Sequence, residues 1–153
     1  MRALGIEAVL LDLDNTLVGW QRKDVSDSVL HWLKELKEQG IRLCLVSNTR
    51  FGKRLLALSS ELDIPCVRRA WKPRKKGFQS AMDQLGVDAH RTAMIGDQMF
   101  TDIYGANRLG IYTVMVRPLA KREFIGTKVS RLIEIVLLSW FKRHEMIKEI
   151  DIL

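Results

Sequence analysis

The chain has 153 residues, of which 47% are hydrophobic and 28% charged. This composition is ordinary for a soluble globular protein and argues against a disordered or fibrous chain, and the length suits one domain with one hydrophobic core. The formal net charge of +7 favours phosphorylated substrates, polyanions or an anionic membrane surface as partners, without choosing among them. The first residues run directly into an acidic segment with no small-residue cleavage site, so we expect a cytoplasmic protein without a secretory signal.

The predicted elements alternate between strand and helix. Residues 7–14 (EAVLLDLD) form an apolar run that becomes acidic at its end, as a buried parallel strand does at a sheet edge. Residues 26–39 carry apolar side chains at helical spacing, and Ser26 or Asp27 can cap the start and Gly40 the end. The remaining predicted elements are a strand 41–46, a helix 52–61, a short strand 65–68, a helix 74–85, a strand 92–95, a helix 99–109 and a strand 112–116.

This alternation with short connections predicts an α/β fold, a three-layer, Rossmann-like sandwich around a central parallel sheet. In such sheets, ligands bind at the carboxyl ends of the strands, beside the starts of the following helices. Four of these ends are polar: residues 12–16 (DLDNT), residues 47–49 (SNT), the lysine-rich stretch from Lys72, and residues 96–98 (GDQ) with Asp102 close behind. We therefore expect them to meet at one edge of the sheet and to form one pocket.

The residue types at these ends favour phosphoryl transfer. Two carboxylates at a spacing of two on an extended strand point to the same face, so Asp12 and Asp14 repel unless a cation or a proton compensates them. Magnesium takes oxygen ligands, which fits a site of Asp12, Asp97 and a backbone carbonyl better than any histidine or cysteine arrangement in the sequence. The Lys72 ammonium can neutralise the nucleophile and the transferred phosphoryl group, while the Ser47 hydroxyl holds phosphoryl oxygens.

In this order, the segments DLDNT, SNT, KP and GDQ followed by TD resemble the four motifs of the haloacid dehalogenase superfamily. The resemblance implies a phosphatase in which Asp12 is the nucleophile that forms an aspartyl-phosphate, while Asp14 protonates the leaving alcohol and later activates water. It implies a magnesium site that involves Asp12, Asp14 and Asp97. The other implied roles are phosphoryl binding by Ser47, the third-motif lysine for Lys72, and support of the metal through its bound waters for Asp102.

Two assignments stay open. Lys76 lies in the same loop and helix start as Lys72 and could reach the same point, although the position of Lys72 before Pro73 favours Lys72. Asn48 either contacts the substrate or caps the next helix. We therefore place Asn48 and Lys76 beside Ser47 as candidate substrate-binding residues.

A narrower resemblance covers most of the chain. DLDNTLVGW, the SNT segment, the lysine-proline step, IGDQMFTDIYGANRLG and the late VRPL resemble the YqeG-type, or phosphatidylglycerophosphate phosphatase-like, subfamily. The resemblance implies conversion of phosphatidylglycerophosphate to phosphatidylglycerol in phospholipid biosynthesis. Residues 18–40 and 50–71 leave no room for the cap domain that larger relatives use to enclose small substrates. We therefore expect an open site that suits a bulky or membrane-held phosphomonoester, or one that a partner subunit covers.

Two other functions compete with this interpretation. A phosphatase of a small soluble sugar phosphate would use the same residues. A protein without activity would instead use the basic stretch RRAWKPRKK, residues 68–76, to hold a partner, a membrane or nucleic acid. A single aromatic residue, Trp71, and the lack of a recognisable nucleic-acid module disfavour nucleic acid. The intact pair of Asp12 and Asp14 disfavours a binding protein.

The chain ends in an amphipathic segment that begins near Lys128 and carries apolar residues at helical spacing. Only seven residues separate Glu134 from Lys142, whereas a transmembrane helix needs about 20. We therefore expect residues 1–120 to form the catalytic core. Residues 121–153 are expected to form a helical extension that packs on the core, on another subunit of a homo-oligomer, or on the inner face of the membrane.

Overall fold

The computed structural model describes residues 2–19, 24–50 and 52–119. Within them, five strands form one parallel sheet in the order β3-β2-β1-β4-β5. The strands are β1 (Ala8–Leu11), β2 (Arg42–Val46), β3 (Cys66–Val67), β4 (Thr92–Gly96) and β5 (Tyr112–Met115). The chain winds outward from β1 to β3 and then crosses back to place β4 beside β1. The carboxyl ends of β1 and β4 therefore flank the point where the strand order reverses, which is where ligands bind in sheets of this type.

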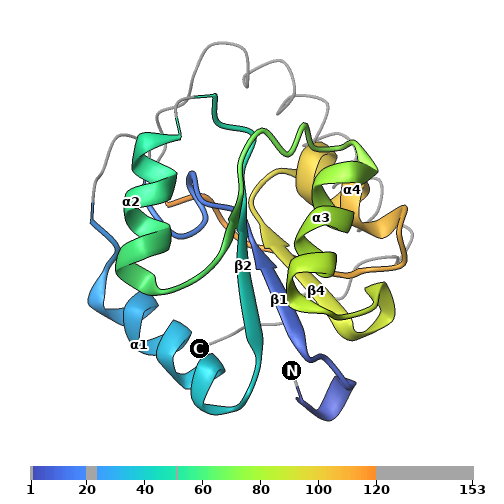
Figure 1. The fold of residues 1–153 in the computed structure, drawn as a ribbon, viewed down its shortest axis with the longest axis horizontal. Coiled ribbons are helices and arrows are strands. Elements are labelled where there is room, and N and C mark those ends of the chain that lie inside the picture. Colours follow the sequence, from blue (N-terminus) through green and yellow to red (C-terminus); the bar gives the residue numbers. More distant parts are fainter. Residues whose placement is uncertain (1, 20–23, 51, 120–153) are drawn as a thin grey trace. The chain divides into compact units, whose positions relative to one another are not determined.

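Helices cover both faces of the sheet (Figure 1). Helices α1 (Asp27–Glu38) and α2 (Lys53–Leu62) lie on one face, and α3 (Lys75–Leu85) and α4 (Gly105–Asn107) lie on the other. The three-layer α/β sandwich that the sequence predicts is thus confirmed. Among the described residues, only α1 separates β1 from β2 and only α2 separates β2 from β3, and none of these residues forms a cap domain.

Alternating side chains of the buried strands build the two halves of the core. Val9 and Leu11 of β1 point into the layer of α1 and α2, where they join Leu33 and Leu55. Leu10 points the other way and packs in the cluster that contains Phe78 of α3. Because successive side chains of a strand face opposite sides, a continuous apolar strand such as AVLL can be buried on both faces at once. The position of the strand end is thereby held firmly.

Two predicted elements differ from the observed ones. The predicted strand 7–14 ends at Leu11, so that Asp12 and Asp14 lie in the segment between the strand and the turn of residues 15–17. The predicted helix 99–109 begins as a π-helix, Met99–Tyr104, and continues only briefly as α4. In this π-helix the Ile103 amide donates to the Gln98 carbonyl five residues earlier, at 3.3 Å. Such wider turns are frequent at functional sites, and this one follows β4 directly.

No helix in the described ranges is both long enough and apolar enough to cross a bilayer. The predicted helical extension of residues 121–153 lies outside the described residues and stays a prediction.

Candidate active site

A buried group of four ionisable side chains lies beyond the carboxyl ends of β1 and β4. The Lys72 ammonium lies 2.5 Å from Asp12 Oδ1 and 2.6 Å from Asp102 Oδ1. Carboxylate oxygens of Asp12, Asp97 and Asp102 lie within 4.8 Å of one another. All four residues are at most 5% exposed. The structure therefore joins three motifs that lie far apart in the sequence into one charged cluster.

The pKa values of Asp12 and Lys72 in this group are strongly perturbed. Burial raises the pKa of Asp12 to about 7; the positive charge of Lys72 opposes this increase, and the negative charges of Asp102 and Asp97 add to it. For Lys72, burial lowers the pKa, but the carboxylates of Asp102 and Asp12 outweigh burial and raise it above its ordinary value. Lys72 is therefore charged at neutral pH, while its single positive charge does not offset the effect of burial on Asp12.

The cluster can bind a divalent metal ion. When all four groups are ionised, three carboxylates and one ammonium leave two negative charges uncompensated. Asp12 Oδ2 is buried and has no hydrogen-bond partner among the described residues, so this oxygen is available to a ligand. The candidate ligand atoms are all oxygens, which suits a hard cation of the magnesium type. Both Asp102 oxygens, by contrast, already have partners, namely Lys72 Nζ and the backbone amide of Gln98 at 3.2 Å.

Close packing at Gly96 makes room for Asp102. A Cβ atom at Gly96 would lie 2.3 Å from Asp102 Oδ2, so a larger residue at the end of β4 would displace this carboxylate. The π-helix carries Asp102 back toward β4, and its backbone amide donates to Gln98 O at 3.0 Å. The glycine of the GDQ motif and the aspartate of the TD motif therefore form one structural unit.

The loop that carries Lys72 is fixed by the second motif. Asn48 Nδ2 donates to the Lys72 carbonyl at 3.0 Å, and the Lys72 amide donates to Asn48 Oδ1 at 2.7 Å. Ser47 contributes its backbone carbonyl, which accepts from the Ala70 amide at 3.0 Å. Its buried hydroxyl oxygen accepts from the Thr49 amide at 3.2 Å. The two bonds of the Asn48 side chain hold the backbone of Lys72. They are neither a helix cap nor a substrate contact, which are the two roles that the sequence left open for Asn48.

Asp14 lies outside the group of three carboxylates. Its Oδ1 accepts a hydrogen bond of 2.7 Å from Arg54 Nη1, and the two side chains are 28% and 30% exposed. Arg54 is a residue that the motifs did not reveal. Its position in the sequence could have indicated this role, because Arg54 lies in the first turn of α2. The positive end of the helix dipole there disfavours a cation unless an anionic side chain pairs with it.

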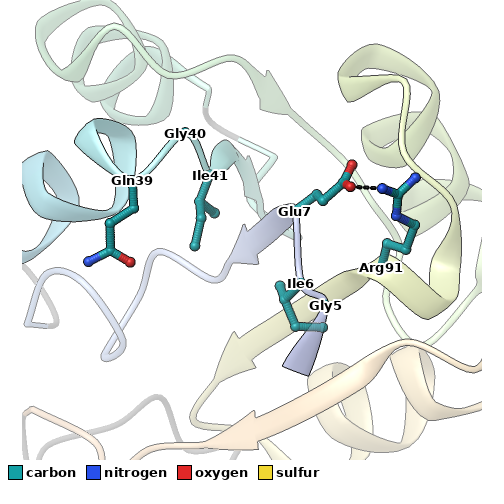
Figure 2. A pocket seen from close by; sticks show the side chains of 7 residues that line it. All are labelled: Gly5, Ile6, Glu7, Gln39, Gly40, Ile41 and Arg91. Atoms are coloured by element: carbon teal, nitrogen blue, oxygen red, sulfur yellow. Dashed lines mark ion pairs between the residues drawn. The ribbon is translucent and has the colours of Figure 1, made fainter. Parts of the chain in front are cut away.

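The remaining predicted residue, Lys76, is exposed on the first turn of α3, away from the buried group that Lys72 enters. A separate pocket of about 500 Å³ lies at the opposite, amino-terminal edge of the sheet (Figure 2). It is lined by residues 5–7, residues 39–41 and Arg91, and Arg91 is ion-paired with Glu7. None of the predicted site residues lines this pocket.

Comparisons with known proteins identify the family of this chain. A model of the haloacid dehalogenase-like hydrolases matches residues 18–110. The probable phosphatase YqeG of Bacillus subtilis (strain 168) is 35% identical over 143 residues, which cover 94% of this chain and 83% of the relative.

Two further matches are with phosphatases. The chloroplastic phosphatidylglycerophosphate phosphatase 1 of Chlamydomonas reinhardtii is 33% identical over 88% of this chain, which spans only 53% of that relative. Among solved structures, the HAD phosphatase from Thermococcus onnurineus aligns with a TM-score of 0.56 and 27% identity, covering 67% of this chain and 51% of the other.

Proposed function

The chain belongs to the haloacid dehalogenase-like hydrolases and is a phosphatase, and we propose that it hydrolyses phosphomonoesters with magnesium through an aspartyl-phosphate on Asp12. The observation that carries this proposal is the buried contact of Asp12 with Lys72 beside Asp97 and Asp102. Lys72 holds Oδ1 of Asp12, so Oδ2 is the atom that can attack. A fixed nucleophile with fixed neutralising charge is what phosphoryl transfer requires of a protein.

The proposed reaction has two steps. Asp12 Oδ2 attacks phosphorus, the bond to the leaving oxygen breaks, and Asp14 gives its proton to the departing alcohol. Water then attacks the phosphorus of the aspartyl-phosphate, gives its proton to Asp14 and releases phosphate, which regenerates Asp12. The oxygen of the Ser47 hydroxyl already accepts from the Thr49 amide, and its hydrogen would be donated to a phosphoryl oxygen.

A magnesium ion would supply positive charge to the phosphoryl oxygens. The Asp12 oxygen that does not attack and the carboxylate of Asp97 would hold it directly, and Asp102, with both oxygens engaged, would support it through bound water. The predicted contribution of Asp14 to the metal would come from its backbone carbonyl, because its carboxylate is paired with Arg54.

For the substrate, we propose phosphatidylglycerophosphate. The name of the Chlamydomonas relative supports this choice. The open connections after β1 and β2, which hold α1 and α2 but no cap among the described residues, are compatible with a bulky ester. A small soluble sugar phosphate is the alternative that the substrate experiment has to exclude.

The catalytic proposal is tested by magnesium-dependent release of phosphate from a soluble aryl phosphate. We expect Asp12→Asn, which keeps the shape of the side chain, to lower the rate by at least about a thousandfold. Thermal unfolding of the variant with magnesium checks that the fold is intact. Equal rates for the native chain and Asp12→Asn would remove Asp12 from the mechanism.

The substrate proposal needs a second comparison. Hydrolysis of phosphatidylglycerophosphate in mixed micelles is measured against hydrolysis of soluble sugar phosphates at matched concentration. We expect a higher kcat/KM for the lipid. A clear preference for a sugar phosphate would overturn the lipid assignment and leave the catalytic proposal standing.

A further inference from the structure

Three large aromatic side chains are exposed near the buried cluster. Trp71 and Phe100 are each 52% exposed and Tyr104 is 50% exposed, whereas most large apolar side chains of the described residues are buried. Trp71 immediately precedes Lys72, and Phe100 lies two residues before Asp102. Because Lys72 and Asp102 form an ion pair of 2.6 Å, the two segments that carry these aromatic residues are held together.

Packing between the same segments supports this placement. A Cβ atom at Gly105 would lie 3.0 Å from Pro73 Cα, so the residues after Tyr104 pass close beside the residues after Trp71. The rings of Phe100 and Tyr104 stack at a centroid distance of 5.5 Å and an angle of 9°. Stacking orders these two rings without burying them. We call Trp71, Phe100 and Tyr104 the aromatic rim.

Cationic side chains accompany the aromatic rim. The Arg50 guanidinium lies 5.9 Å from the ring centroid of Trp71, and that of Arg108 lies 5.5 Å from the ring centroid of Tyr104. Residues 68–76 and 98–108 contain a single acidic residue, Asp102, which is fully buried. The exposed charges of these two segments are therefore all positive: Arg68, Arg69, Arg74, Lys75, Lys76 and Arg108.

We propose that the aromatic rim and its cations form a docking surface for an anionic phospholipid bilayer. Rings with exposed edges insert at the depth of the lipid headgroups, and arginine and lysine side chains bind lipid phosphates beside them. The carboxyl edge of the sheet, where Asp12 and Lys72 lie, then faces the membrane. This inference rests on the proposed function and deepens it, because it states how a membrane-held phosphomonoester reaches a site without a cap.

The test is sedimentation of the full chain with vesicles. Native protein is compared with Trp71→Ala/Phe100→Ala on vesicles of phosphatidylcholine with phosphatidylglycerol and on vesicles of phosphatidylcholine alone. We expect the native chain to prefer the anionic vesicles, and the double variant to bind them at least about tenfold more weakly, since two apolar groups no longer insert. Phe100→Ala alone, which leaves the Lys72 loop unchanged, is expected to show an intermediate loss.

The matched control is Tyr112→Ala, which removes an aromatic side chain that is 40% exposed at the start of β5, on the opposite edge of the sheet. It should bind vesicles as the native chain does. Hydrolysis of a soluble aryl phosphate is measured for every variant and should stay within about twofold of native, which separates docking from catalysis. The docking proposal is overturned if the native chain shows no preference for anionic vesicles, if the double variant binds like the native chain, or if Tyr112→Ala loses as much binding. If the native chain does not hydrolyse the aryl phosphate, the catalytic proposal is overturned instead.

Discussion

Arg54 Nη1 of helix α2 lies 2.7 Å from Asp14 Oδ1 in the turn after β1. The same guanidinium reaches the Gly19 carbonyl at 3.4 Å, so it connects the start of α2 to both ends of that turn. Asp14 is the residue to which we assign proton transfer, and Arg54 is therefore its positioning partner.

We expect Arg54→Ala to lower kcat by about ten- to a hundredfold and to change KM less, because Asp14 loses its orientation while the phosphoryl-binding residues keep theirs. Steady-state hydrolysis of an aryl phosphate measures both constants. Guanidinium ion at millimolar concentration should restore part of the rate to this variant. Lys53→Ala, at an exposed neighbouring position, is the control and should behave as native. A native kcat for Arg54→Ala would show that Asp14 needs no such partner.

The two candidate lysines can be separated by identical substitutions. We expect Lys72→Met to lower the rate by at least about a hundredfold, since it removes a buried charge beside the nucleophile. It should also destabilise the metal-free protein by about 3 kcal/mol, because Asp12 and Asp102 lose their cationic partner. Lys76→Met, on the exposed surface of α3, should leave both quantities nearly unchanged. Urea unfolding and phosphate release report the two effects, and the opposite ranking of the two lysines would contradict the assignment.

Gly96→Ala tests whether the position of Asp102 matters. The added Cβ would approach Asp102 Oδ2 to 2.3 Å, so we expect a loss of about 1–3 kcal/mol in the free energy of unfolding and at least a tenfold loss in activity. Gly110→Ala is the matched control, because Gly110 has a φ of +76° but no atom within 4 Å of an added Cβ. That variant should lose about 1 kcal/mol of stability and keep its activity. Equal activity losses in the two variants would indicate general destabilisation.

Stability should depend on pH and magnesium together. Asp12 has an ordinary pKa of 3.8 and a pKa of about 7 in the folded chain, so between these values the native state holds a proton that the unfolded state has released. The contribution of this proton to stability is fully present below pH 3.8 and is lost as the pH rises through about 7. The titration of Asp12 should therefore make the metal-free protein less stable at pH 8 than at pH 5.

Magnesium compensates the ionised carboxylates, so it should raise the melting temperature more at pH 8 than at pH 5. The measurement is thermal unfolding in a chelator and in magnesium at both pH values. Asp12→Asn should reduce the difference between the two pH values, since it removes the titrating group. An equal effect of magnesium at both pH values would contradict the raised pKa of Asp12.

The sequence predicted the fold well because its strands are short, apolar and regularly separated by amphipathic helices. The run AVLL of β1 and the buried positions of α1 carry signals that depend only on local spacing. The strand end was misplaced, since residues 12–14 continue the apolar and acidic pattern, whereas β1 ends at Leu11 and the turn follows at residues 15–17. The π-helix was also missed, because its wider turn has no distinct sequence period.

The sequence by itself determined the residues that carry the proposed chemistry: Asp12, Asp14, Lys72 and Asp97 stand at strand ends with motif spacing, and each residue type has a recognisable part in phosphoryl transfer. Only the tertiary structure decided which of them touch. It placed the Lys72 ammonium between Asp12 and Asp102, used Asn48 to hold the backbone of Lys72, and paired Asp14 with Arg54. The physical reason is that spacing along the chain fixes only the strand end at which each residue stands. Packing across the sheet edge, down to the missing Cβ of Gly96, fixes which charges are buried together.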